Sequence, residues 1–176
     1  MDQRVVGKYY WRLLHGLSHR YTPQRDAVRM ALLLRSLKVL FPCKFCRRSY
    51  TAKLQHDHFA PHLASGRALR RWLIRLHNTV NREIERPRVT HDQALLLGQS
   101  FARSVRYNFE QVVFITLANI VRTHGPGTSM PMRTLARVLD HYPELTPPAI
   151  SVSKGLVTCA PPALRKRIPK NSIVTR

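Results

Sequence analysis

Prolines divide the first half of the chain into segments in which apolar residues recur at helical spacing. Pro23, Pro42, Pro61 and Pro87 stand at the ends of these segments. A proline has no amide hydrogen and disfavours helix for the residue before it, so each should end one helix or precede the next. The pattern predicts a first helix that stops near residue 21, followed by helices over about 24–40, 43–56 and 67–85.

The second half continues the helical pattern and then loses it. Apolar spacing predicts helices over about 92–103, 105–123 and 133–141, and the middle one is apolar on most sides. From Pro143 onward prolines recur and the ending is basic, which predicts an irregular basic tail. No segment alternates like a strand, so the predicted class is all-α. We divide the chain into residues 1–90, a helical extension over 91–142 that adds core or a dimer contact, and a tail over 143–176.

The charge of the chain is strongly positive. Its 30 Lys and Arg residues against 9 Asp and Glu residues give a formal charge of +21, which favours polyanions as partners. No single dense basic tract accompanies this charge, and a solvated surface also explains it. Non-specific binding of nucleic acid is therefore one expectation. A basic surface that only keeps the protein in solution is the other.

Three cysteines are an odd number, which argues against a secreted disulfide framework. The N-terminus has no apolar signal region, and no run approaches the roughly 18 apolar residues that a membrane span requires. We therefore expect a soluble protein of a reducing compartment. Residues 1–20 are basic and amphipathic, as in a mitochondrial presequence, but they also carry candidate site residues, so we expect them to be retained. Cys159 is either a passive thiol of the tail or forms an intermolecular disulfide.

Cys43 and Cys46 lie one helical turn apart behind Pro42. Two thiols held in this way form either a redox pair or half of a metal site. The start of a helix and nearby cations stabilise thiolate, so we expect a lowered pKa for the pair. The nearby cations are Lys44, Arg47 and Arg48.

Histidines after the cysteine pair raise the alternative of zinc. His56 and His58 follow Cys46 closely and would complete a set of two cysteines and two histidines. Their spacing departs from that of zinc sites, and residues two apart on a helix point to different sides. We therefore predict no metal. His91, His124 and His141 are expected at the surface.

Polar residues interrupt the apolar face of the helix predicted over 67–85. His77 and Asn81 are four residues apart and share a face, with Asn78 beside them. Trp11 and His15 have the same spacing in the first helix. Such side chains beside buried leucines need hydrogen-bond partners, which a heteroaromatic ligand rich in donors and acceptors would supply.

These residues form a set of motifs in a recognisable order. The set is Gly7-Lys8-x-x-Trp11-x-x-Leu14-His15, Tyr21-x-Pro23, Pro42-Cys43-x-x-Cys46-Arg47, Trp72-Leu73-x-x-Leu76-His77-Asn78-x-Val80-Asn81 and Arg86-Pro87. It resembles the Erv/ALR family of FAD-linked sulfhydryl oxidases over about residues 7–88, and the compact form is most like the virus-encoded members. The resemblance implies a four-helix bundle over about residues 3–87 with FAD between the helices.

The resemblance also implies an activity. Substrate dithiols pass electrons to the Cys43–Cys46 disulfide, then to FAD, and then to O2 to give H2O2, with Cys46 as the flavin-proximal sulfur and Cys43 as the exchanging one. The implied cofactor-binding residues are Lys8, Trp11, His15, Tyr21, Cys46, His77, Asn78, Val80, Asn81 and Arg82. Lys8 and Arg82 are placed near the phosphates.

Some features depart from the family pattern. Lys8 stands where relatives have arginine, residues 88–106 contain no cysteine, and no shuttle Cys-x-x-Cys is present. The substrate therefore reduces the disulfide directly, or a redox relay protein does. The resemblance further implies a homodimer, and the viral likeness implies host cytoplasm, nucleus or virion. The alternative function is a basic helical protein, structural or associated with nucleic acid, that keeps the fold with little or no turnover.

Overall fold

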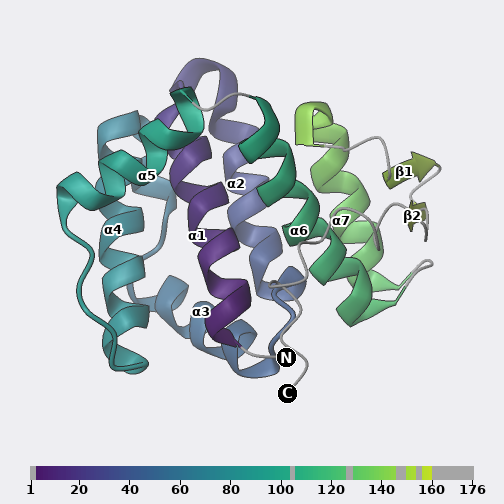
Figure 1. Ribbon diagram of the computed structural model, residues 1–176, viewed down its shortest axis with the longest axis horizontal. Helices are drawn as coiled ribbons and strands as arrows, with labels where there is room; N and C mark the ends of the chain where they lie inside the picture. The colour runs from purple at the N-terminus through teal and green to yellow at the C-terminus, as the bar shows by residue number, and fades with distance from the viewer. Residues whose placement is uncertain (1–2, 104–105, 126–128, 146–149, 154–155, 160–176) are drawn as a thin grey trace.

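The computed structural model describes residues 3–103, 106–125, 129–145, 150–153 and 156–159 (Figure 1). The helices in chain order are α1 (Gln3–His19), α2 (Pro23–Leu40), α3 (Lys44–His56), a 3-10 helix (Ala60–Ala64), α4 (Gly66–Glu83), α5 (His91–Arg103), α6 (Arg106–His124), α7 (Met130–His141) and a second 3-10 helix (Pro143–Leu145). A short hairpin of β1 (Ile150–Ser153) and β2 (Leu156–Cys159) follows. The all-α class predicted from the sequence is confirmed.

The helix ends follow from local chemistry. Pro23 occupies the first turn of α2, where its missing amide hydrogen costs nothing. Ser65 caps α4, because its hydroxyl accepts a hydrogen bond of 3.1 Å from the amide of Ala68. Gly66 follows at a close approach, since a Cβ there would lie 3.2 Å from the carbonyl oxygen of Tyr21. These signals explain why the predicted bounds of the helices were nearly correct.

Helix α1 runs through the middle of the molecule (Figure 1). Helices α4, α5 and α6 pack against it, and α2 packs against α3 and α7. One hydrophobic core joins residues of both halves of the chain, including Leu34, Trp72, Leu117 and Leu135. The helices of the predicted extension thus cover α1 and α2 within the same chain. A dimer contact in the extension stays a prediction.

The hairpin after Pro143 was not anticipated. Its strands are antiparallel, with Ile150 opposite Cys159 and Val152 opposite Val157. β-Branched residues favour extended backbone, which gives the strands a local cause despite the neighbouring prolines. The basic run over 165–170 and the side chain of Cys159 lie outside what the structure describes.

Candidate functional site

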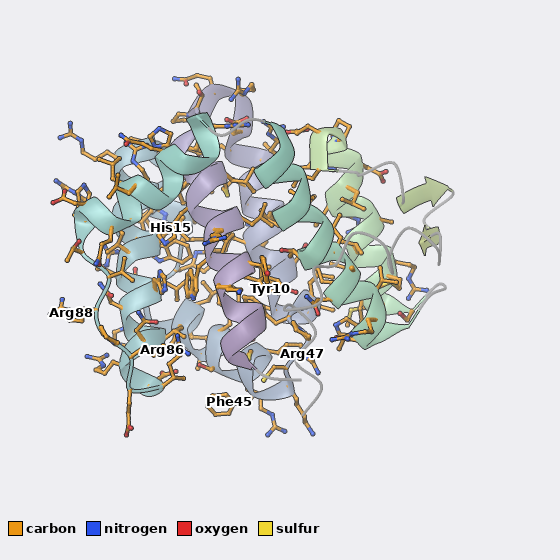
Figure 2. The ribbon with its side chains drawn as sticks, viewed as in Figure 1. Tyr10, His15, Phe45, Arg47, Arg86 and Arg88 are labelled. Carbon is orange, nitrogen blue, oxygen red and sulfur yellow. The ribbon has the colours of Figure 1, made fainter. Side chains whose placement is uncertain are left out.

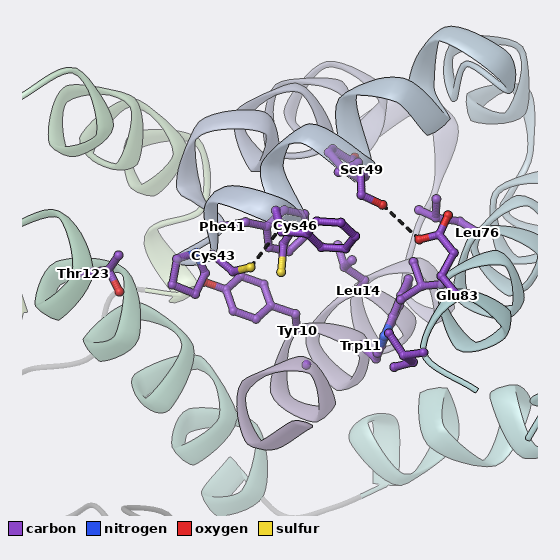
Figure 3. A pocket seen from close by; sticks show the side chains of 16 residues that line it. Tyr10, Trp11, Leu14, Phe41, Cys43, Cys46, Ser49, Leu76, Glu83 and Thr123 are labelled. Atoms are coloured by element: carbon purple, nitrogen blue, oxygen red, sulfur yellow. Dashed lines mark hydrogen bonds between the residues drawn. The ribbon is translucent and has the colours of Figure 1, made fainter. Parts of the chain in front are cut away.

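The two cysteines lie at the start of α3. Pro42 keeps Phe41 out of helical geometry, so α2 ends at Leu40 and the chain restarts at Lys44. Cys43 caps the new helix, and its Sγ accepts a hydrogen bond of 3.2 Å from the amide of Cys46 (Figure 3). Both cysteines are in the reduced form and half-buried. Solvent and interior groups can therefore both contact this pair.

The expected thiolate stabilisation is wrong for Cys46. Burial raises the pKa of its thiol, and the hydrogen bond and charge of Cys43 raise it further. The charge of Arg47 opposes these effects without outweighing them. Its Nη1 donates to the carbonyl oxygens of Phe41 at 2.6 Å and of Pro42 at 3.1 Å. The dithiol form therefore keeps the Cys46 proton at neutral pH.

A cavity of about 580 Å³ lies beside the cysteine pair. Its walls come from α1, the end of α2, α3, α4 and the last turn of α6 (Figure 3). Besides the two cysteines, the aromatic and aliphatic walls are Tyr10, Trp11, Leu14, Phe41, Phe45, Tyr50, Leu76, Val80 and Ile84. Polar groups enter at Ser49, Glu83 and Thr123. The cavity therefore suits a flat, largely apolar ligand in contact with sulfur.

Trp11 joins this cavity to two buried histidines. Its ring stacks on that of His77, with centroids 4.0 Å apart and planes inclined by 10°. His15 Nε2 and His77 Nδ1 lie 3.2 Å apart within hydrogen-bond distance. Burial lowers the pKa of His15 to about 4 and that of His77 to about 3, with the charge of His15 contributing to the second shift. Both imidazoles are therefore neutral at physiological pH, and one donates to the other.

The two asparagines of α4 bind the backbone that follows the helix. Asn78 exchanges two hydrogen bonds with Val89, 3.0 Å to its carbonyl oxygen and 2.7 Å from its amide. Asn81 Nδ2 donates to the carbonyl oxygen of Pro87 at 2.8 Å. These bonds hold the segment in which Glu85 adopts a positive φ of 53°. Both side-chain amides thus have hydrogen-bond partners within the chain, and their contact with a cofactor stays a prediction.

The remaining predicted residues have different surroundings. Val80 lines the cavity. Tyr21 is buried elsewhere, and its hydroxyl donates to the carbonyl oxygen of Leu63 at 2.6 Å. Lys8 is exposed and lies over the ring of Tyr9 at 5.0 Å, and Arg82 is exposed at the end of α4. The structure therefore gathers Trp11, Val80 and the cysteine pair at one cavity, with His15 and His77 against Trp11.

Sequence reasoning missed Tyr10 at the cavity wall. Its hydroxyl is buried without a hydrogen-bond partner among the residues that the structure describes. Burial raises the pKa of this phenol, and the nearby charge of Cys46 raises it further. The helical spacing of Tyr10 indicated only a core residue. The sequence pattern therefore did not predict that Tyr10 lines the cavity.

A charged bridge at the cavity edge was also missed. Glu83 of α4 accepts a hydrogen bond of 3.1 Å from Ser49 on α3 (Figure 3). It accepts a second one of 2.5 Å from Lys53, also on α3. This α3–α4 bridge joins the helix of the cysteines to the helix of His77. Acidic residues are scarce in this basic chain, which was the available signal for Glu83.

Helix α6 supplies a further wall. Thr123 lines the cavity, and the neighbouring His124 is half-buried rather than at the surface as expected. Burial lowers the pKa of His124 and the charge of Arg47 lowers it further, while hydrogen bonds to the backbone of Leu40 and Phe41 oppose these effects. His91 and His141 are exposed, as predicted.

The zinc alternative finds no geometric support. The cysteines start α3 and His56 ends it, so at 1.5 Å per residue about 15 Å of helix separates Cys46 from His56. His58 Nδ1 accepts a hydrogen bond of 3.2 Å from the amide of Ala60. Across the described part of the chain, no three His, Cys, Asp or Glu side chains are grouped so that they could hold a metal ion.

The fold and the site define a helical protein with a dithiol at a helix start beside an aromatic cavity. Residues 8–101 match the sequence model of the Erv1/Alr family, so the chain belongs to this family. It is also similar to the mitochondrial FAD-linked sulfhydryl oxidase ERV1 of Saccharomyces cerevisiae, with 27% identity over 90 residues.

This similarity covers 49% of the chain and 47% of the yeast protein. The chain therefore spans about half the length of the curated relative that it matches. No solved structure matches the chain significantly. Within the described residues, none of the helices is both long and apolar enough to span a bilayer.

Proposed function

We propose that this protein is an FAD-linked thiol oxidase that forms disulfides in substrate proteins with O2 as the electron acceptor. The observation that carries the proposal is the shared wall of Cys46 and Trp11 at the 580 Å³ cavity. Membership of the Erv1/Alr family and the similarity to a yeast FAD-linked enzyme support it. Thiols at a cavity of this kind have an adjacent place for an electron acceptor.

The residues at the cavity fit a flavin ring. Its volume falls within the roughly 300–1,000 Å³ of small-molecule sites, and such sites are mostly apolar with a few polar groups. Trp11 and Tyr10 offer flat aromatic surfaces, and the unpartnered hydroxyl of Tyr10 can donate to a ring oxygen or nitrogen. The exposed cations Lys8 and Arg82 suit the charge of a pyrophosphate.

The resemblance assigns the cofactor contacts to specific side chains. These are Lys8, Trp11, His15, Tyr21, Cys46, His77, Asn78, Val80, Asn81 and Arg82. When bound, FAD supplies the two-electron acceptor that delivers electrons to O2 and yields H2O2. The neutral His15–His77 pair keeps Trp11 in place without adding positive charge behind it.

The cysteines perform the exchange with substrate. A substrate thiolate attacks Sγ of Cys43 in the Cys43–Cys46 disulfide, so that a mixed disulfide forms and Cys46 leaves with the electron pair. The second substrate thiolate then attacks the substrate sulfur and releases Cys43 as thiolate. The amide of Cys46 stabilises that leaving thiolate, because it donates to Cys43 Sγ. The substrate loses two electrons and two protons, and the cysteine pair gains the electrons.

The charge of +21 favours a second candidate function, a basic helical protein associated with nucleic acid and with little turnover. A homodimer and a viral or host-cell location stay predictions from the resemblance alone. A redox relay protein is the proposed partner if small dithiols are oxidised much faster than protein dithiols.

One preparation tests the oxidase proposal. Purified protein should carry flavin absorption near ~450 nm and should consume oxygen when dithiothreitol is added. Cys46→Ser should abolish the oxygen consumption, whereas Cys159→Ser should preserve it. Folded protein that binds no flavin when FAD is supplied and consumes no oxygen would contradict the proposal and favour the nucleic-acid alternative.

A further inference from the structure

The mouth of the cavity beside Cys43 carries exposed apolar side chains. Phe45, between the two cysteines, is 61% exposed, and Ile84, at the end of α4, is 44% exposed. Single exposed apolar residues are ordinary on protein surfaces. These two differ because both line the cavity that the cysteines line. An apolar surface at the reactive sulfur marks a place where another molecule docks.

Cations stand close to these apolar residues along the chain. Lys44 and Arg48 flank Phe45 on α3, and Arg86 follows Ile84. All three are exposed, and their side chains form no hydrogen bond or ion pair with any residue that the structure describes. We call Lys44, Arg48 and Arg86 the basic rim. Figure 2 shows Phe45 projecting from the lower end of the molecule, with Arg86 on one side and Arg47 on the other.

The rim keeps an excess of positive charge. Glu83 forms an ion pair with Lys53. Between residues 83 and 88, Glu85 is the one exposed carboxylate without a partner in the described part of the chain. Uncompensated charges around a cleft raise the local concentration of oppositely charged ligands. A ligand at Cys43 therefore meets positive charge and exposed apolar surface on the residues next to this cysteine.

We infer that the basic rim with Phe45 and Ile84 recognises an acidic polypeptide segment, in which carboxylates and one apolar side chain lie next to the cysteine pair to be oxidised. This inference rests on the proposed function and deepens it to a substrate class. A substrate thiol must approach Cys43 to bonding distance, so the residues beside it contact the rim. The apolar residue covers Phe45, and the carboxylates meet the unpaired cations.

A polypeptide fits this surface better than a nucleic acid does. The charge of the rim attracts either polymer. Phosphate backbones do not use exposed aliphatic side chains such as Ile84, and a nucleic acid brings no thiol to Cys43. Binding of an acidic peptide can therefore be distinguished by experiment from a general attraction of the chain to polyanions.

The kinetic test compares two peptides on the FAD-loaded protein. They share one Cys-x-x-Cys pair and one leucine, and differ in flanking glutamates or lysines. We expect kcat/KM to be larger for the acidic peptide by about tenfold or more at low salt, since steering changes rates on this scale. The ratio should fall at about 1 M salt, where the screening length is only ~3 Å.

Two variants locate the preference. The rim variant Lys44→Glu with Arg48→Glu should abolish or reverse the preference in kcat/KM for the acidic peptide. A change in the redox potential of the protein would affect both peptides alike, because they share the same cysteine pair. Arg133→Glu with Arg137→Glu makes the same charge change on exposed residues of α7, away from the cavity, and should keep the wild-type ratio. A wild-type ratio in the rim variant would overturn the inference.

A binding measurement separates this inference from the oxidase proposal. The same peptides with serine in place of cysteine are titrated by fluorescence anisotropy. Binding of the acidic peptide that is weakened by the rim variant and by Phe45→Ser supports the inference, even if the protein does not oxidise dithiothreitol. A lack of dithiothreitol oxidation would contradict only the proposed oxidase activity. If the protein oxidises dithiothreitol but binds the acidic and the basic peptide equally, the result contradicts only the inference about the rim. A single-stranded oligonucleotide could instead bind more tightly than the acidic peptide, through the rim and without an effect of Phe45→Ser. That result would assign the rim to nucleic acid and contradict the inference.

Discussion

The ring of Trp11 on α1 lies flat against the ring of His77 on α4, with centroids 4.0 Å apart and planes inclined by 10°. Because Trp11 also lines the cavity beside Cys46, this stack fixes one wall of the site against the helix that carries the histidine. The hydrogen bond between His77 and His15 helps to hold the His77 ring in this position.

Loss of the Trp11 ring should weaken cofactor binding. Trp11→Ala removes an aromatic wall and its stacking partner, and aromatic pairs contribute about 0.5–1.5 kcal/mol beyond burial. We expect the dissociation constant for FAD to rise by about tenfold, since 1.4 kcal/mol is a factor of ten. Fluorescence titration of the flavin measures it. Trp11→Phe keeps a ring and should lose less, and equal losses in both variants would contradict a stacking role.

The buried histidines should make stability depend on pH. The folded pKa values of about 4 and about 3 lie below the ordinary 6.5, so between these values the unfolded state binds more protons. Their contribution is fully present above pH ~6.5 and is lost as pH falls toward 4, by up to about 1.4 kcal/mol per pH unit for each histidine. Urea unfolding between pH 7 and 4.5 measures the slope. His15→Gln should reduce the slope, and an unchanged slope would argue against a buried neutral pair.

Asp26 should stabilise the start of α2. Burial alone would raise the pKa of its carboxyl, but bonds from Arg25, Thr22 and Arg29 outweigh it and lower the pKa to about 2. Asp26→Asn should destabilise the protein by about 2 kcal/mol, because the two arginines lose a buried charged partner. Chemical denaturation measures the change. Asp140→Asn, at an exposed position without a described partner, should change stability by less than ~0.5 kcal/mol; similar losses in the two variants would exclude this role for Asp26.

The α3–α4 bridge should affect turnover more than stability. Lys53 and Glu83 keep 11% and 40% of their side chains exposed, and partly exposed pairs contribute roughly 0–1 kcal/mol. Glu83→Lys should lower kcat with dithiothreitol severalfold, because the bridge positions the cysteine helix against α4. The exchanged pair Lys53→Glu with Glu83→Lys should recover much of the loss. A failure of the exchanged pair to recover any activity would show that Glu83 acts through something other than this bridge.

Much of the helical architecture could be predicted from the sequence. Apolar spacing and prolines gave helix bounds within a few residues, as for the helix expected over 24–40 and found as Pro23–Leu40. The Cys-x-x-Cys motif and the Trp11 and His77 patterns pointed to residues that the structure brings to one place. Local signals of this kind depend on neighbours along the chain, which a sequence displays directly.

Features that depend on packing between distant elements could not be predicted. Thr123 reaches the cavity only because α6 packs on α1. The cations near Cys46 suggested a lowered thiol pKa, but burial dominates and raises it. Asn78 and Asn81 were expected to need a ligand, and they found backbone partners between residues 87 and 89. Burial and partner choice are properties of the assembled core.

Anaerobic reduction of the flavin by dithiothreitol tests most directly whether the cysteine pair feeds a cofactor in this cavity. Wild-type protein should lose its absorbance near ~450 nm when the thiol is added. Cys46→Ser should retain bound flavin and its colour but should bleach far more slowly. Bleaching of Cys46→Ser at the wild-type rate would contradict electron transfer through Cys46.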